Sequence, residues 1–181
     1  DKSRSRGLGD VYKRQPVSIY LKLRDYYSNT ILLESSDYSA KDNSYAYICC
    51  NPIAKFYVKK NTLFTEYPDG SKFQKEVVKD IRIFSELEKF MNKFSIQDDS
   101  NQSKKYISKG LFGYMTYDSV RFFEKININN ESFGDDIPDI YYSLYSEIIV
   151  VNTFNNEANL ISHSGNKNKI DEIEKLSLIH I

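Results

Sequence analysis

The sequence is poor in several of the residues on which chemistry usually depends. Among 181 residues it has no tryptophan, two cysteines and two histidines. Only His163 lies in the central region, and no cysteine or second histidine stands at the spacing of a metal site. No apolar run approaches the roughly 18 residues of a membrane-spanning helix, because charge and asparagine interrupt the longest run, at residues 147–151. We therefore expect neither a histidine-based metal centre nor a membrane segment.

The chain also lacks an excess of charge of either sign. Its 25 Lys and Arg residues balance 25 Asp and Glu residues. Residues 16–175, taken alone, hold 20 basic and 23 acidic residues and are mildly acidic. Proteins that bind nucleic acid normally show a strong basic excess, so we expect no nucleic-acid partner.

The two cysteines, Cys49 and Cys50, are adjacent in the sequence. Neighbouring residues seldom reach disulfide geometry, so both thiols are expected to be reduced. Since no signal peptide is visible, we expect a cytoplasmic protein.

The chain is rich in aromatic residues, with 15 tyrosines and 11 phenylalanines. These residues are enough to form a substantial hydrophobic core in one domain. Residues 1–15 show neither helical nor strand periodicity, and residues 176–181 form the other end of the chain. Both segments resemble translated sequencing-adapter read-through, so we expect residues 16–175 to form the domain, cut from a longer protein.

The patterning of this domain predicts an α+β fold, mainly antiparallel β-sheet with a few packed helices. Helices are expected at residues 16–25, at 86–94 after a Ser85 N-cap, and at 118–124. On the second helix, Leu87, Phe90, Met91 and Phe94 should face the core. Strands are expected at residues 30–34, 44–50, 53–58, 62–66, 72–78, 109–117, 140–152 and 158–162, with Pro52 breaking the second from the third.

A search for a self-contained active site fails. No phosphate-binding glycine loop and no Gly-x-Ser-x-Gly nucleophile motif is present. The acidic pairs at residues 98–99 and 135–136, and the lysine pairs at 59–60 and 104–105, fit solvated surface better than a site. His163 fits a surface histidine. The sequence therefore yields no catalytic residue and no metal ligand.

Three segments, taken in order, resemble a known family. They are residues 32–35, reading Leu-Leu-Glu-Ser, residues 45–52, and residues 110–124, a Gly-Tyr-x-x-Tyr-Asp-x-Val-Arg-x-x-Glu pattern framed by Gly110 and Gly113. Together with the Asp-x-Pro-Asp stretch at 136–139, they are similar to the N-terminal domain of anthranilate synthase component I, a chorismate-utilising enzyme.

The resemblance implies a parent enzyme that uses Mg²⁺ to convert chorismate and ammonia into anthranilate and pyruvate. A glutamine amidotransferase subunit, component II, would supply the ammonia. In this family the magnesium and chorismate ligands lie in a larger C-terminal domain, so the resemblance places no catalytic residue in this chain and implies that the fragment alone is inactive.

The resemblance also implies a regulatory site. In this family the Leu-Leu-Glu-Ser segment lines the tryptophan feedback site, so Glu34 and Ser35 would contact the inhibitor and Tyr45 would lie at the same pocket. A carboxylate can pair with the α-ammonium group of an amino acid, and a hydroxyl can satisfy its other polar atoms.

Two other readings remain open. Aminodeoxychorismate synthase component I, in the folate branch, has the same fold, but its corresponding segment tends toward Asp-Ser where this chain has Glu34 and Ser35. A non-enzymatic, tyrosine-rich binding module is the reading from a different class.

Overall fold

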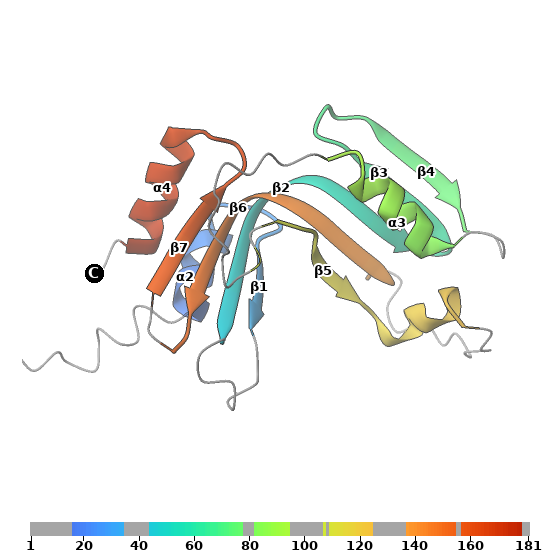
Figure 1. Cartoon of the computed structure of the whole chain (residues 1–181), viewed down its shortest axis with the longest axis horizontal. Helices are drawn as coiled ribbons and strands as arrows, with labels where there is room; N and C mark the ends of the chain where they lie inside the picture. The colour runs from blue at the N-terminus through green and yellow to red at the C-terminus, as the bar shows by residue number, and fades with distance from the viewer. Residues whose placement is uncertain are drawn as a thin grey trace, which may run out of the picture. The chain divides into compact units, whose positions relative to one another are not determined.

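A computed structural model of the chain describes residues 16–34, 44–77, 82–94, 107, 109–124, 137–154 and 157–178. Its strands form one sheet in the order β4-β3-β2-β6-β5, with β1 paired to β2 and β7 paired to β6 (Figure 1). The five strand pairs of known register are all antiparallel. The predicted fold class, a mainly antiparallel sheet with a few helices, is confirmed.

The elements follow the predicted order with shifted bounds. The strands are β1 (Ile31–Glu34), β2 (Tyr45–Lys59), β3 (Thr62–Glu66), β4 (Lys72–Glu76), β5 (Phe112–Met115), β6 (Ile140–Asn152) and β7 (Glu157–Ser162). The helices are α2 (Pro16–Arg24), α3 (Ile83–Met91), the 3-10 helix η1 (Tyr117–Phe122) and α4 (Lys167–Leu178).

The chain divides into two compact units that share its two longest strands. The first unit comprises Asp1–Pro52, Gln102–Ser108 and Tyr145–Ile181, and the second comprises Ile53–Asn101 and Lys109–Leu144. Strands β2 and β6 therefore each contribute one half to each unit.

The core of the first unit joins helices α2 and α4 to the sheet. Leu23 of α2 and Ile173 of α4 are fully buried, and they pack with Ile48 of β2 and Ile149 of β6. Pro16 opens α2 at the position where a helix needs no N–H partner. Burial of each such side chain stabilises the fold by about 1.5–3 kcal/mol, so this packing holds both helices on the strands.

The core of the second unit lies between α3 and one face of β2 and β3. Phe56, Val58 and Leu63 of the strands pack with Ile83 and Phe90 of the helix. The Phe56 and Phe90 rings lie 5.6 Å apart at a tilted angle, within the range that favours aromatic pairs.

The expected break at Pro52 is wrong, because β2 runs without interruption from Tyr45 to Lys59. Its register with β1 ends at Cys49 and its register with β3 begins at Lys55. Pro52 therefore lies in a stretch paired with neither strand, where a proline is tolerated. Asn51 before it has a left-handed backbone (φ 59°), which asparagine adopts more readily than most residues.

The predicted start of the second helix is also wrong. Helix α3 begins at Ile83 with Arg82 in the N-cap position and no side-chain cap, so Ser85 lies inside the helix. Ile83 is 1% exposed, and its burial fixes the start of the helix where no cap does. Phe90 is buried as predicted, but Met91 is 46% exposed and does not face the core.

Helix α4 has no counterpart among the predicted elements. Its apolar residues Ile170, Ile173 and Leu176 recur every three residues along an otherwise polar segment. Leu176 belongs to the core of the first unit, so the helix continues past the expected domain boundary at residue 175.

Candidate functional site

The end of strand β1 carries the first predicted site residue. Strand β1 pairs with β2 in a register that places Glu34 opposite Ala46 and Leu33 opposite Tyr47. Glu34 is the exposed last residue of the strand. Its carboxylate makes no hydrogen bond or ion pair with any residue that the structure describes.

Tyr45 lies at the same end of the β1–β2 pair but on its other face. Residues opposite each other in an antiparallel pair share a face, and faces alternate along a strand. Glu34 thus shares a face with Ala46, which belongs to the core under the helices, whereas Tyr45 shares the opposite face with Tyr47. A ligand that contacts both Glu34 and Tyr45 side chains must therefore span the two faces of the β1–β2 pair.

The other groups at this end come from β2 and the turn after β6. The Ser44 carbonyl accepts hydrogen bonds from the backbone N–H and the hydroxyl of Thr153, at 2.9 and 3.0 Å. The hydroxyl of Tyr47 accepts a hydrogen bond of 3.1 Å from the backbone N–H of Ile107. Ser35, the third predicted site residue, lies outside the described residues.

The first unit contains a buried polar cluster that the sequence did not predict. Glu147, in the middle of β6, is 1% exposed. Its Oε1 accepts a hydrogen bond of 2.8 Å from the Ser164 hydroxyl, and its Oε2 accepts one of 3.2 Å from the Asn51 side-chain amide. The same amide donates to the Ser146 hydroxyl at 3.2 Å. The one glutamate within the apolar run of residues 140–152 was the signal available in the sequence.

This cluster is distinct from the end of β1. Asn51 lies beyond Cys49, which pairs with Ile31 at the opposite end of β1 from Glu34. Buried carboxylates are tolerated when hydrogen bonds satisfy them, and both Glu147 oxygens have such a donor. We assign the cluster a structural role in holding Asn51, the left-handed residue of β2, against β6.

The two cysteines form no disulfide, as their adjacency predicted, and both are buried. Burial raises the pKa of both thiols, and that of Cys50 to about 12, although a hydrogen bond with Thr30 opposes the shift there. Thiolates are the nucleophilic form of cysteine, so neither residue is suited to nucleophilic chemistry.

Of the two glycines expected to permit a close approach, Gly113 makes one, whereas a Cβ atom at Gly110 would meet nothing within 4 Å. Gly113 of β5 lies opposite Tyr142 of β6. A Cβ atom at Gly113 would stand 1.8 Å from the Tyr141 carbonyl oxygen, a distance no side chain can adopt. This glycine is therefore required for pairing β5 with β6.

The arginine of the same segment has a structural partner. Arg121 forms an ion pair of 2.8 Å with Asp139, and the side chains of both are 18% exposed. The backbone of Asp139 donates to the Val58 carbonyl and accepts from the Thr116 N–H, both at 2.8 Å. The pair thus ties η1 to the start of β6, so these two motif residues stabilise the fold.

Nothing in the described part of the chain forms a metal centre. No group of three or more His, Cys, Asp or Glu side chains there is placed to hold a metal ion. His163 is half-buried rather than fully exposed, and its backbone N–H donates to the Ser146 carbonyl at 2.7 Å. The acidic pairs at residues 98–99 and 135–136 lie outside the described residues. The Mg²⁺ implied by the resemblance therefore has no fitting ligand set among the side chains that the structure describes.

Across the described ranges, none of the helices combines the length and the apolar character that crossing a membrane demands.

The geometry defines a fold class that solved structures share. The chain superposes on anthranilate synthase component I from Streptococcus pneumoniae with a TM-score of 0.51 and 16% identity, over 99% of this chain and 36% of that one. At this identity the likeness establishes the fold alone. No family model matches the sequence.

Sequence similarity points to the same family. The chain is 25% identical to anthranilate synthase component 1 of Methanothermobacter marburgensis over 158 residues, which are 85% of this chain and 30% of the relative. It is 27% identical to the Aquifex aeolicus protein of the same name over 159 residues, again 30% of the relative. The resemblance to anthranilate synthase component I is thus confirmed, and the chain spans about a third of the length of these relatives.

Proposed function

We propose that the chain is the regulatory part of an anthranilate synthase component I and carries one side of a tryptophan feedback site. The parent enzyme would form anthranilate and pyruvate from chorismate and ammonia in tryptophan biosynthesis. A glutamine amidotransferase subunit would deliver the ammonia. Mg²⁺ and the catalytic groups would belong to segments outside this chain.

The proposal rests on the exposed Glu34 carboxylate at the end of β1, together with the similarity to anthranilate synthase component 1 proteins. Glu34 presents an exposed carboxylate with no partner among the described residues, and it is the Glu of the Leu-Leu-Glu-Ser segment. A carboxylate in this position suits the α-ammonium group of tryptophan, through a charge-assisted hydrogen bond. Tyr45 offers a ring on the opposite face of the β1–β2 pair, which would contact the indole.

Feedback follows from linkage between two states of the parent enzyme. A ligand that binds one state more tightly shifts the population toward it, by no more than the ratio of its affinities for the two states. Tryptophan bound at the end of β1 would favour the inactive state in this way, without contacting the reacting atoms.

The test uses the full-length protein and follows anthranilate formation from chorismate and ammonia. Replacing Ser35 with phenylalanine should fill the pocket and abolish inhibition by tryptophan while leaving the uninhibited rate within about twofold of wild type. Glu76→Gln is the control, because Glu76 is an exposed strand glutamate in the second unit. Unchanged inhibition in Ser35→Phe would refute the regulatory site.

Product identity separates the two enzyme branches in the same assay. Anthranilate, the ortho isomer, is expected. Formation of aminodeoxychorismate, which leads to the para isomer, would instead assign the protein to the folate branch. Absence of any reaction with chorismate, in a folded full-length protein, would favour a binding module.

A further inference from the structure

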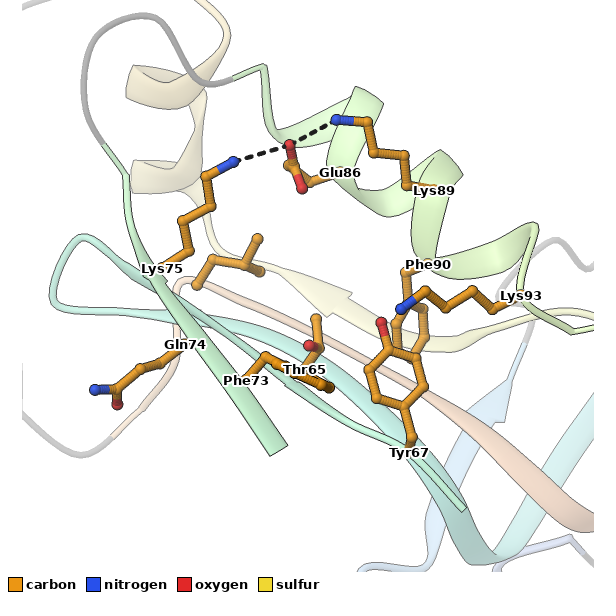
Figure 2. Close-up of a pocket in the computed structure, with 10 residues that line it drawn as sticks. Thr65, Tyr67, Phe73, Gln74, Lys75, Glu86, Lys89, Phe90 and Lys93 are labelled. Atoms are coloured by element: carbon orange, nitrogen blue, oxygen red, sulfur yellow. Dashed lines mark hydrogen bonds and ion pairs between the residues drawn. The ribbon is translucent and has the colours of Figure 1, made fainter. Parts of the chain in front are cut away.

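The second unit contains a cavity of about 250 Å³ between the β3–β4 hairpin and helix α3. Figure 2 shows its floor on the strands and its rim on the helix. The cavity belongs neither to the end of β1 nor to the buried Glu147 cluster, both of which lie in the first unit. Its lining combines aromatic rings with lysines, a combination that bears on what it can bind.

The apolar part of the cavity is built by alternate residues of the hairpin. Thr65 lies opposite Phe73, so both side chains face α3. The Tyr67 ring meets the Phe73 ring edge-on at 5.8 Å and lies 5.3 Å from the Phe90 ring of the helix. Phe90 is 1% exposed, whereas Phe73 is 58% exposed. The aromatic lining therefore runs from the buried Phe90 ring of the helix to the exposed Phe73 ring of the hairpin.

At one end of the cavity the lysines outnumber the carboxylates. Lys75 of β4 and Lys89 of α3 both bind the same carboxylate oxygen, Oε1 of Glu86, at 3.3 and 3.0 Å (Figure 2). The pKa of Glu86 is held below its ordinary value, mainly by the hydrogen bond from Lys89. One negative charge thus faces two positive charges at this end.

A third lysine lies at the other end of the cavity, where its charge acts on the exposed carboxylate of Asp69. The Lys93 ammonium stands 4.3 Å from the centre of the Tyr67 ring and 5.8 Å from that of Phe73. Within the described part of the chain it forms no ion pair with an acidic side chain. Among the side chains that line the cavity, three lysines thus face one carboxylate, that of Glu86.

We propose that this cavity binds a small aromatic carboxylate with a single ring. The ring would lie against Phe73 and Tyr67, and the carboxylate would pair with Lys93 next to them. A charge-assisted hydrogen bond to an ammonium group and an offset or edge contact between rings are both favourable interactions. The volume of the cavity limits the ligand to a single ring, because sites for drug-sized ligands have about 300–1,000 Å³ and this cavity is smaller.

This proposal is independent of the proposed function. The tryptophan site is built on β1 of the first unit, and it calls for a ligand ammonium group beside a protein carboxylate. The cavity under α3 has the reverse polarity. Either site can fail its test without affecting the other.

The experiment is a titration of the full chain with benzoate, followed by protein NMR chemical shifts. Binding is expected in the millimolar range, given the few atoms of the ligand. Shift changes should be confined to the backbone around Phe73 and Lys93. Benzamide, the neutral analogue, and benzylamine, the cationic one, should bind at least about fivefold more weakly because they lack the negative charge.

Two substitutions test separately what the lysine charge and the aromatic ring contribute to benzoate binding. Lys93→Gln should weaken benzoate binding about fivefold, and Phe73→Ala should weaken it by a similar factor. Both residues are exposed, so the fold should tolerate either change, and an unchanged melting temperature verifies this. Lys72→Gln is the matched control, since Lys72 is also on β4 but pairs with Glu66 at 3.4 Å and does not line the cavity.

Four results would overturn the proposal. They are no binding of benzoate at millimolar concentration, equal binding of benzylamine, unchanged affinity in Lys93→Gln, or inorganic phosphate binding as tightly as benzoate. The last result would show that the rings contribute nothing to recognition.

Discussion

Neutralising Arg121 should destabilise the second unit while leaving its strands intact. The informative substitution is Arg121→Met, which keeps most of the apolar stem and removes the guanidinium group. It abolishes the 2.8 Å ion pair with Asp139 and the 2.9 Å hydrogen bond to the Asp118 carbonyl. The backbone hydrogen bonds of Asp139 do not depend on its side chain, so β6 should keep its start.

The magnitude follows from the burial of the pair. Exposed ion pairs contribute about 0.2–1 kcal/mol, whereas removing one partner of a fully buried pair costs about 3–5 kcal/mol. With both side chains 18% exposed, the Arg121–Asp139 pair lies between these limits. We expect Arg121→Met to lower the free energy of unfolding by about 2 kcal/mol, or the melting temperature by about 4–8 °C.

A double-mutant cycle with Asp139→Asn isolates the pair itself. Urea unfolding, monitored by circular dichroism, should give a coupling energy of about 1–2 kcal/mol. The control cycle uses Lys72→Met and Glu66→Gln, since the Lys72 side chain is 70% exposed and its coupling should stay below about 0.5 kcal/mol. Equal coupling in the two cycles would refute the structural role assigned to Arg121.

Three further outcomes are expected. Gly113→Ala should lower the free energy of unfolding by more than about 3 kcal/mol in urea, because the added Cβ meets the Tyr141 carbonyl oxygen; a loss below about 1 kcal/mol would contradict the observed pairing. Asn51→Gly keeps the left-handed backbone but strips Glu147 of one donor, so calorimetry should show a loss of about 1–3 kcal/mol. The pKa of Cys50 is raised from its ordinary value near 9 to about 12, so the folded state holds the thiol proton more tightly than the unfolded state does. The free energy of unfolding should therefore be unaffected below about pH 8 and should fall toward pH 12 by up to about 1.4 kcal/mol per pH unit. Cys50→Ala should reduce this slope.

The regular part of the fold was predictable because its patterns are local. The strand at residues 140–152 was predicted with its observed bounds, and its pairing with the segment at 158–162 is confirmed. The hairpin around Gly70 was predictable for the same reason, since the glycine supplies the positive φ (83°) that the turn requires.

The errors arose where tertiary contacts override local rules. Ser85 is a good N-cap residue, but burial of Ile83 extends α3 beyond it. A proline usually ends a strand, but Pro52 lies between the stretch of β2 that pairs with β1 and the stretch that pairs with β3. Helix α4 lies in a mostly polar segment, and it packs against α2, which is about 150 residues away in the sequence.

The candidate site was predictable only in part. The family motif pointed to Glu34, and the structure places it, exposed, at the end of β1. Strand alternation could have shown that Tyr45 lies on the opposite face, but only once the register with β1 was known. The Glu147 cluster brings together residues about 100 positions apart, so its hydrogen bonds could not be deduced from spacing.

Equilibrium binding of tryptophan to the full-length protein tests the central claim most directly. Calorimetric titration of the wild type and Glu34→Gln should show about tenfold weaker binding in the variant, because the ammonium loses its charged partner. Glu76→Gln should bind as the wild type does. Equal affinity in all three proteins, or no tryptophan binding in the wild type, would contradict the assignment of a feedback site to the end of β1.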